Sequence, residues 1–596
     1  MHMRVQPRIS GAGEDMVYRK GSLEDMKRSR RCATYGGAMS EMITNIPFPT
    51  AVASKILDDI GFNGIIDSSL DWDPKQCKIS PGDAFKSIIL STASVKERPA
   101  IMNIEIEYQE APLELLFDTV KESMDLGRFE LSAHLDRLFE AGVDNVFMKV
   151  AAAARAHYNI VSKAAHADTT SVSVWGAYDS DYENDGGIDI TKGYSKDKRP
   201  DLNQYMVGTV VNDIGVPIYS KPLDGNTSDV EWNRTCIDTI ENILKREDLV
   251  YVADSKVVTE DLVRKLNDSD IRFLSRLPKN FGDNLQVKVL AQTDVGSLKH
   301  MDKRPEEKNR TDRHYTDMTV ECNGMSLRLI PQVTSHNKGK GDKAVERERQ
   351  SFQKALGAFV TMYNCMKDAQ AAFARFEKTI SKKYKMFRVS AEYKEFTAES
   401  RGRGRPRKDG TDVIREQMVH VGISYEEIPE VRDAVWKSGE FIVFVTNIPT
   451  REEDPVRGMD TEDVIRLYNN EWRVEGQFAT LKKPAIADRL FLEKQSRAEA
   501  LVSVFTMGVL VRGLMQLLIR RGIERIPDSD LPRYGVDHGP LQRNVTHAYF
   551  IQQFQGTCIH YFHRSREFTF GSTTVSARAE FFLNTMGIKP KFCACK

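Results

Sequence analysis

The sequence predicts an α/β protein, in which a mixed β-sheet forms a catalytic domain that carries a large insertion and follows a small helical domain. Three observations predict this fold class. Apolar residues recur every three or four positions up to about residue 160, as in helices. From residue 164 the pattern changes to the two-residue alternation of strands. Two apolar runs typical of buried strands, LVYVADS and FIVFVTNIP, flank a long charged stretch.

The length of 596 residues predicts several units, since a domain averages ~150 residues. Residues 1–45 are polar and weakly basic, which predicts a disordered or loosely attached arm. A helical domain is expected over residues 46–160, and residues 526–596 are expected to form a C-terminal region.

The first part of the catalytic domain, residues 161–279, is predicted as a strand, a β-hairpin, a helix, a strand, a helix and a strand. The sequence VNDIGVP marks the hairpin turn. Ser228 or Asp229 can cap the first helix, and the strand after that helix ends on Asp254. This order predicts a mixed sheet with antiparallel strands first and parallel strands after them.

The charged residues 280–438 are predicted to form an insertion, after which the sheet domain resumes over residues 439–525. The insertion contains the basic sequence RGRGRPRKDG. After the resumed strand, YNNEWRVEGQFATLK predicts an amphipathic helix from Tyr468 to Lys482.

An apolar segment from Ala500 to Ile519 is predicted to be a buried core helix, because Arg512 interrupts it and a membrane span needs ~20 uncharged residues. The first residues lack the apolar core of a signal peptide. Eight scattered cysteines fit a reduced cytoplasm better than a disulfide framework. We therefore expect a soluble cytoplasmic protein without a membrane partner.

Three polar residues in the predicted helix, Tyr468, Glu475 and Lys482, are spaced seven apart. Seven residues miss two full helical turns by only ~20°, so the three side chains would form one stripe. An ordinary amphipathic surface helix would show the same pattern.

Three carboxylates are candidates for one site: Asp168 on the first strand, Asp254 at the end of a neighbouring strand, and Glu475 on the later helix. Carboxylates are ligands that Mg²⁺ prefers. Two such ions (or two Mn²⁺ ions) ~4 Å apart could activate a water or a 3′-hydroxyl and stabilise the leaving oxygen of a phosphodiester. The alternative is that each strand-end aspartate is a turn or cap residue.

Five sequence stretches occur in an order and spacing that resemble the DDE transposases of bacterial and archaeal insertion sequences. They are HADTTSVSV, GYSKDKRPDLNQ, GNTSD, YVADS and YNNEWRVEGQFATLK. More narrowly, they resemble the branch with the signature Tyr-x2-Arg-x3-Glu-x6-Lys. The resemblance covers residues 160–275 and 440–520, and more loosely the helical region before them.

This resemblance implies an RNase H-like fold and DNA transposition at a divalent-metal site. By position, Asp168, Asp254 and Glu475 would be the catalytic metal ligands. Tyr468 and Lys482 would contact phosphates of the transposon end.

One position departs from the family signature, because Glu471 stands where the family has arginine. Glu471 could be an extra outer ligand, could pair with a basic residue, or could compete with Glu475 for the catalytic role. We favour Glu475, since it alone is seven residues from both Tyr468 and Lys482. Arg473 lies ~160° around the helix from Glu475 and so cannot replace the missing arginine, although it is a candidate DNA contact.

Arg403 and Arg405 belong to an Arg-Gly-Arg-Pro sequence that resembles an AT-hook core, which can enter a narrow minor groove. The alternative is a solvated basic linker. The helical domain could bind the DNA end or serve only for packing.

Two further groups of residues have more than one possible role. Trp175 and Trp472 could stack on an unpaired base, although tryptophans are more often core residues. The C-terminal region contains residues of the types that bind Zn²⁺, but their spacing matches no closed zinc pattern. They are Cys558, His560, His563, Cys593 and Cys595.

The sequence therefore predicts a DDE transposase that binds the terminal inverted repeats of its element, cleaves the DNA ends and joins them to target DNA. A homodimer on two paired ends is the expected working form. One alternative is a catalytically inactive, repurposed DNA-binding protein. A second is a two-metal nuclease that cuts but never joins.

Overall fold

A computed structural model describes residues 43–571 with several gaps. The gaps are 94–99, 176–184, 283, 305–310, 402–412, 470–471, 483–491, 493, 532, 536–537, 541–542, 544, 554–557 and 563–566. The predicted N-terminal arm lies outside the described residues except for residues 43–45.

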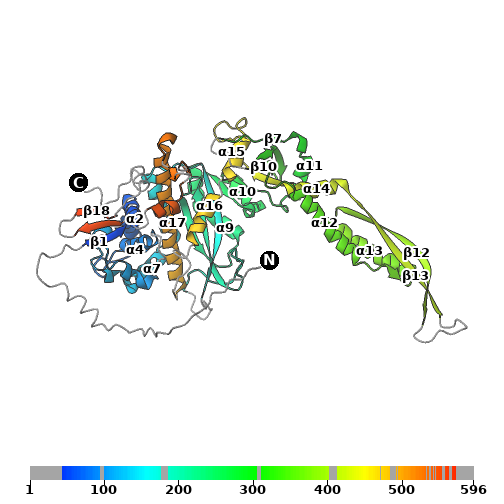
Figure 1. Cartoon of the computed structure of the whole chain (residues 1–596), viewed down its shortest axis with the longest axis horizontal. Helices are drawn as coiled ribbons and strands as arrows, with labels where there is room; N and C mark the ends of the chain where they lie inside the picture. Colours follow the sequence, from blue (N-terminus) through cyan, green and yellow to red (C-terminus); the bar gives the residue numbers. More distant parts are fainter. Residues whose placement is uncertain are drawn as a thin grey trace, which may run out of the picture.

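A helical region comes first in the described chain and packs beside a large sheet (Figure 1). The predicted mixed α/β fold with a leading helical region is therefore confirmed. Its helices are α2 (Phe48–Asp59), α3 (Phe62–Ser69), α4 (Pro81–Ala93), α5 (Ile104–Glu107), α6 (Leu113–Leu116), α7 (Arg128–Glu140) and α8 (Val143–His157).

The predicted order of strand, hairpin, helix, strand, helix and strand is found in the structure. These elements are β2 (Ala164–Val174), β3 (Asn203–Asn212), β4 (Pro217–Leu223), α9 (Asp229–Arg246), β5 (Val250–Ala253), α10 (Glu260–Asp268) and β6 (Phe273–Arg276). Strand β2 is central, since it pairs antiparallel with β3 and parallel with β5. The sheet continues from β5 to a parallel β6, as the sequence predicts.

The sheet extends further than predicted, because strands from the expected insertion join it. Its order in the described chain is β4-β3-β2-β5-β6-β14-β10-β8-β7, with β9 paired to β10. Strand β10 pairs directly with β14, so the part of the chain that leaves the sheet begins after β10 and not at residue 280. The added elements are β7 (Lys299–His300), β8 (Arg313–Tyr315), β9 (Met318–Cys322), β10 (Met325–Thr334), β14 (Phe441–Thr446) and the helix α11 (Leu285–Gln292).

Helix α9 covers one face of the sheet. The ring of Trp232 on α9 stacks on Tyr219 of β4, with ring centroids 5.7 Å apart. Gly208 of β3 permits this approach, since a Cβ at that position would lie 2.5 Å from the indole. A residue without a side chain is therefore needed at this point of the strand.

Helix α17 (Gln495–Glu524) packs between the helical region and the other face of the sheet (Figure 1). It is the one described helix long and apolar enough to cross a membrane, and 89% of its apolar window is buried inside the fold. Arg512 is buried as well and donates a hydrogen bond to the carbonyl of Thr92. The prediction of a core helix is therefore confirmed.

An elongated arm extends from the far end of the sheet (Figure 1). It has a core of its own, built around Phe352 and Phe387, whose rings stack with centroids 3.9 Å apart. Its elements are α12 (Lys340–Gly357), β11 (Met362–Tyr363), α13 (Met366–Lys383), β12 (Phe387–Arg401), β13 (Val413–Glu427) and α14 (Pro429–Glu440).

The C-terminal region returns to the start of the described chain. Strand β1 (Ile43–Pro47) pairs antiparallel with β17 (Cys558–Phe562), which pairs with β18 (Glu567–Gly571). The other elements of this region are β15 (Arg533–Gly535), β16 (His538–Pro540) and α18 (His547–Gln553).

Candidate active site

The register of the sheet brings two of the predicted carboxylates together. In the parallel pair β2–β5, Ala167 lies opposite Ala253. The next residues, Asp168 and Asp254, therefore lie side by side where β5 ends. Asp254 also caps the following turn by accepting a hydrogen bond from the Lys256 N–H at 3.0 Å. A strand-end cap and a site carboxylate are thus compatible roles for this residue.

A third carboxylate, Asp229, joins them from the first turn of α9. It accepts a hydrogen bond from the Thr169 hydroxyl at 2.5 Å. Its charge raises the pKa of both Asp168 and Asp254, as expected for neighbouring carboxylates. Sequence reasoning treated Asp229 only as a helix cap. Its position in the GNTSD stretch, directly before α9, is the signal that could have identified it.

The ammonium of Lys196 lies among these carboxylates. Its Nζ is 3.6 Å from Oδ1 of Asp168 and 3.7 Å from Oδ1 of Asp229. It also donates hydrogen bonds to the carbonyl and the hydroxyl of Thr169, at 2.7 and 3.0 Å. The cluster therefore already attracts a cation, and its hard oxygen donors are of the type that Mg²⁺ or Mn²⁺ prefers.

Burial and neighbouring charges set the protonation of the site. Burial raises the pKa of Asp168 to about 6; Lys196 and the Thr169 N–H lower it, while Asp254 and Asp229 raise it. Burial also raises the pKa of Asp254, with Asp229 adding to the shift and the Lys256 N–H opposing it. Burial and mutual repulsion make it unfavourable for these neighbouring carboxylates to be ionised together. A bound divalent cation would offset that repulsion.

We expect Asp168→Asn to stabilise the metal-free protein at neutral pH. The pKa of this carboxyl is 3.8 in its ordinary state and about 6 in the fold, so stability falls as the pH rises from 3.8 through 6. The amide avoids this loss and should gain on the order of 1–3 kcal/mol at pH 7.5. Urea denaturation at pH 7.5 and 4.5 measures the gain, which should shrink at the lower pH.

Asp201→Asn is the matched control for that measurement. Asp201 is exposed, and its hydrogen bond to Arg199 lowers its pKa to about 2, the opposite direction to Asp168. The control should therefore show no gain at pH 7.5. An Asp168→Asn midpoint equal to that of the wild type at pH 7.5 would contradict the prediction.

Helix α16 (Trp472–Leu481) lies over the sheet beside Asp168. Asp168 pairs with Thr209 of β3, and Thr209 lines a small cavity under α16 together with Phe478 and Leu481. Glu475, one turn before Phe478, is exposed. Asp168, Asp254 and Asp229 are neighbours, but within the described ranges no three His, Cys, Asp or Glu side chains lie close enough to hold one metal ion. The structure thus joins Asp168 to Asp254 but does not bring Glu475 into contact with them.

The predicted helix from Tyr468 to Lys482 is only partly described, because residues 470 and 471 lie outside the described residues. Helix α15 (Thr461–Tyr468) ends at Tyr468, and α16 begins at Trp472. The Tyr468 ring is buried, with its centroid 4.4 Å from that of Phe444 and the Arg276 guanidinium 5.2 Å above it. Tyr468 therefore packs in the core, and its contact with DNA phosphate stays a prediction.

Lys482 follows α16 and donates a hydrogen bond to Asp197 at 2.7 Å. Asp197 is the neighbour of Lys196, so one loop contacts both the carboxylate cluster and the end of α16. In the same loop, the Arg199 guanidinium lies 4.9 Å over the ring of Trp175, which is 67% exposed. Trp175 is therefore not a core residue.

The remaining predicted residues cannot be compared with the structure. Glu471, Arg403, Arg405, His563, Cys593 and Cys595 lie outside the described residues. Arg473 and Trp472 lie in α16, but their side chains are outside the described part.

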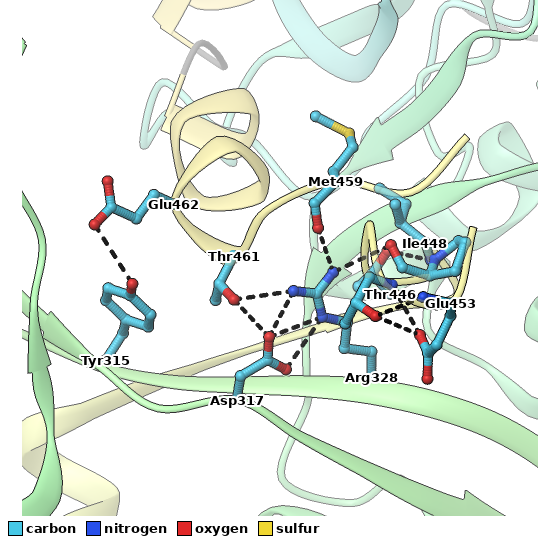
Figure 2. Close-up of polar contacts among 11 residues, drawn as sticks. Tyr315, Asp317, Arg328, Thr446, Ile448, Glu453, Met459, Thr461 and Glu462 are labelled. Carbon is cyan, nitrogen blue, oxygen red and sulfur yellow. Dashed lines mark hydrogen bonds and ion pairs between the residues drawn. The ribbon is translucent and has the colours of Figure 1, made fainter. Parts of the chain in front are cut away.

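Arg328 of β10 fixes the start of α15 (Figure 2). The Arg328 side chain is 4% exposed, and its guanidinium donates hydrogen bonds to both carboxylate oxygens of Asp317. It also donates to the Met459 carbonyl at 2.8 Å and to the Thr461 hydroxyl at 2.9 Å. A buried charge needs such complete pairing. The network holds the chain that leads into α15 and α16, and sequence reasoning missed it because Arg328 lay in the predicted insertion.

Residues 167–507, more than half of the 596, match the family model described as a transposase DDE domain. Residues 42–152 match a domain of unknown function (DUF4277). No curated protein matches the chain.

Proposed function

The chain belongs to the DDE transposase family, and we propose that it is the transposase of a bacterial or archaeal insertion sequence. It would bind the terminal inverted repeats of its element, cleave the DNA ends and join them to target DNA. The observation that carries the proposal is the pair of adjacent carboxylates, Asp168 and Asp254, at the end of parallel strands. The sheet order β4-β3-β2-β5-β6 supports the RNase H-like fold that the resemblance implies.

Asp168 and Asp254 would hold the divalent ions, with Glu475 as the third ligand. Bound Mg²⁺ or Mn²⁺ ions would supply an activated oxygen nucleophile and stabilise the leaving oxygen of the phosphodiester. Glu475 would have to move toward the strands, and its position at the surface of α16 leaves it accessible to do so. The ionised form of Asp168 is the ligand, so with a pKa of about 6 in the metal-free site, metal binding below that pH must displace a proton from Asp168.

Lys482 and the elongated arm are the proposed contacts with DNA. Lys482 would exchange its carboxylate partner Asp197 for a phosphate next to the cleaved bond. On α13, Arg375, Lys378 and Lys382 are exposed and lie at helical spacing, which forms one basic stripe along the arm. This stripe supports a phosphate contact along the arm, and Arg403 and Arg405 are proposed to add to it as an AT-hook-like sequence.

Arg473 and Tyr468 remain proposed DNA contacts by position. We further propose that two copies act on paired ends in the cytoplasm of the host cell. Because Glu471 stands where the family signature has Arg, membership of the branch that carries this signature is part of the proposal.

An assay with DNA that carries the inverted repeats flanking the gene tests this function. With Mg²⁺ present, we expect cleavage at the repeat ends and joining of the freed 3′-hydroxyl to a labelled target, and EDTA should stop both. DNA binding without cleavage would favour the repurposed, inactive protein. Cleavage without joining would favour the nuclease. The preserved Asp168 and Asp254 argue against the inactive alternative.

A further inference from the structure

We propose that Lys196 is a built-in counter-ion of the acidic site, which competes with the divalent metal for Asp168 while it also neutralises the neighbouring Asp229. The inference rests on the proposed function, since it concerns the same metal site. Lys196 lies in the GYSKDKRPDLNQ stretch but belongs neither to the Tyr-x2-Arg-x3-Glu-x6-Lys signature nor to the predicted ligand set.

Lys196 is fixed to the central strand at two levels. Its backbone N–H donates to the Ser171 hydroxyl at 3.0 Å, and its Nζ donates to the Thr169 carbonyl at 2.7 Å. A lysine side chain normally loses conformational entropy when it is held in one place. Here the strand fixes both ends of the side chain, so the ammonium is directed at the carboxylates by the fold.

The contacts between the ammonium and the carboxylates are longer than hydrogen bonds. Nζ stands 3.6 and 3.7 Å from the nearest oxygens of Asp168 and Asp229, and the side chain is 31% exposed. A divalent ion binds carboxylate oxygens at ~2.0–2.6 Å and carries twice the charge. It would therefore take the Asp168 oxygens from Lys196, but only after overcoming the repulsion of the ammonium beside them.

Other cations nearby do not have this position. Lys256 donates its backbone N–H to Asp254. This hydrogen bond and the Lys256 charge both lower the pKa of Asp254, which burial raises. Lys198, two residues along the same loop, is exposed. Lys198 therefore offers a matched control with the same charge, the same loop and none of the described contacts to the carboxylates.

The loop that carries Lys196 is also tied to α16. Asp197 accepts the hydrogen bond from Lys482. The turn around Asp197 is closed by the Arg199 N–H, which donates to the Ser195 hydroxyl at 3.1 Å. Strand β2 therefore holds the ammonium of Lys196, and Lys482 at the end of α16 holds the loop that carries it. The metal-free site is stabilised by this arrangement, and metal must displace the ammonium from it.

A titration of the full-length protein with Mn²⁺ at pH 7.5, without DNA, tests the inference. The electron spin resonance signal of free Mn²⁺ measures how much of the ion is bound. Lys196→Met and Lys196→Gln should each bind Mn²⁺ at least ~10-fold more tightly than the wild type. Lys196→Arg and Lys198→Met should stay within ~3-fold of it. An unchanged or weaker affinity in both Lys196→Met and Lys196→Gln would overturn the proposal.

Asp168→Asn in the Lys196→Met background separates the inference from the function. We expect this second change to remove the tighter binding. If binding requires Asp168 but is insensitive to Lys196, only the counter-ion role fails. If Asp168→Asn has no effect in either background, there is no metal site at this residue, and the proposed metal-dependent function fails together with the counter-ion role.

Discussion

Asp254→Asn is expected to abolish DNA cleavage and joining, while DNA binding persists. The amide keeps the shape of the side chain but removes the charge that a metal ligand needs. We expect both rates to fall by more than the ~10–100-fold that follows loss of an outer-shell partner. Cleavage of end-labelled repeat DNA, with gel retardation to follow binding, measures the two properties separately.

Asp261→Asn is the control for that substitution. Asp261 lies in the first turn of α10, is 59% exposed, and pairs with Arg234 at the surface, away from the carboxylate cluster. It should leave both rates unchanged. Activity retained in Asp254→Asn would refute the site assignment.

The same assay decides which glutamate completes the site. Glu475→Gln should be inactive and Glu471→Gln active, if α16 delivers Glu475 to the strand carboxylates. The reverse result would assign the catalytic role to Glu471.

Arg328→Met is expected to lower the free energy of unfolding by about 3–5 kcal/mol, because it breaks one side of a buried ion pair. The change leaves Asp317 without its bidentate partner and frees the Met459 carbonyl. Methionine keeps much of the side-chain volume, so the loss reports the polar network and not a cavity. Urea denaturation followed by near-ultraviolet circular dichroism measures it.

Arg451→Met is the matched comparison in the same part of the fold. Arg451 is 55% exposed and pairs with Asp460 at 2.9 Å. An exposed ion pair contributes about 0–1 kcal/mol, so this variant should differ little from the wild type. Equal midpoints for Arg328→Met and Arg451→Met would show that the Arg328 network does not hold α15.

Local patterns were sufficient for the first half of the sheet. The alternation in β2, the hairpin turn between β3 and β4, and the apolar run that ends at Asp254 each depend on nearby residues. The same is true of α17, whose length and composition match those of a buried helix. The adjacency of Asp168 and Asp254 then follows from the ordinary parallel pairing of strands that flank a crossover helix.

The edge of the sheet could not be predicted in this way. Strands β7 and β8 are two and three residues long, and β10 contains Arg328 and Pro331, residues that argue against a central strand. The Pro331 carbonyl still accepts a hydrogen bond from the Thr316 N–H, and Arg328 is paired by Asp317. Both partners lie in the short connection between β8 and β9, so the β10 segment alone looks like a polar insertion.

The sequence by itself determined the family, the leading strand order and the two strand-end aspartates, because each depends on residues close together in the chain. Only the tertiary structure decided that Asp229 and Lys196 join those aspartates and that Tyr468 is buried. The physical reason is that periodicity records which side of a segment is buried, whereas the partner that covers it comes from a distant part of the chain.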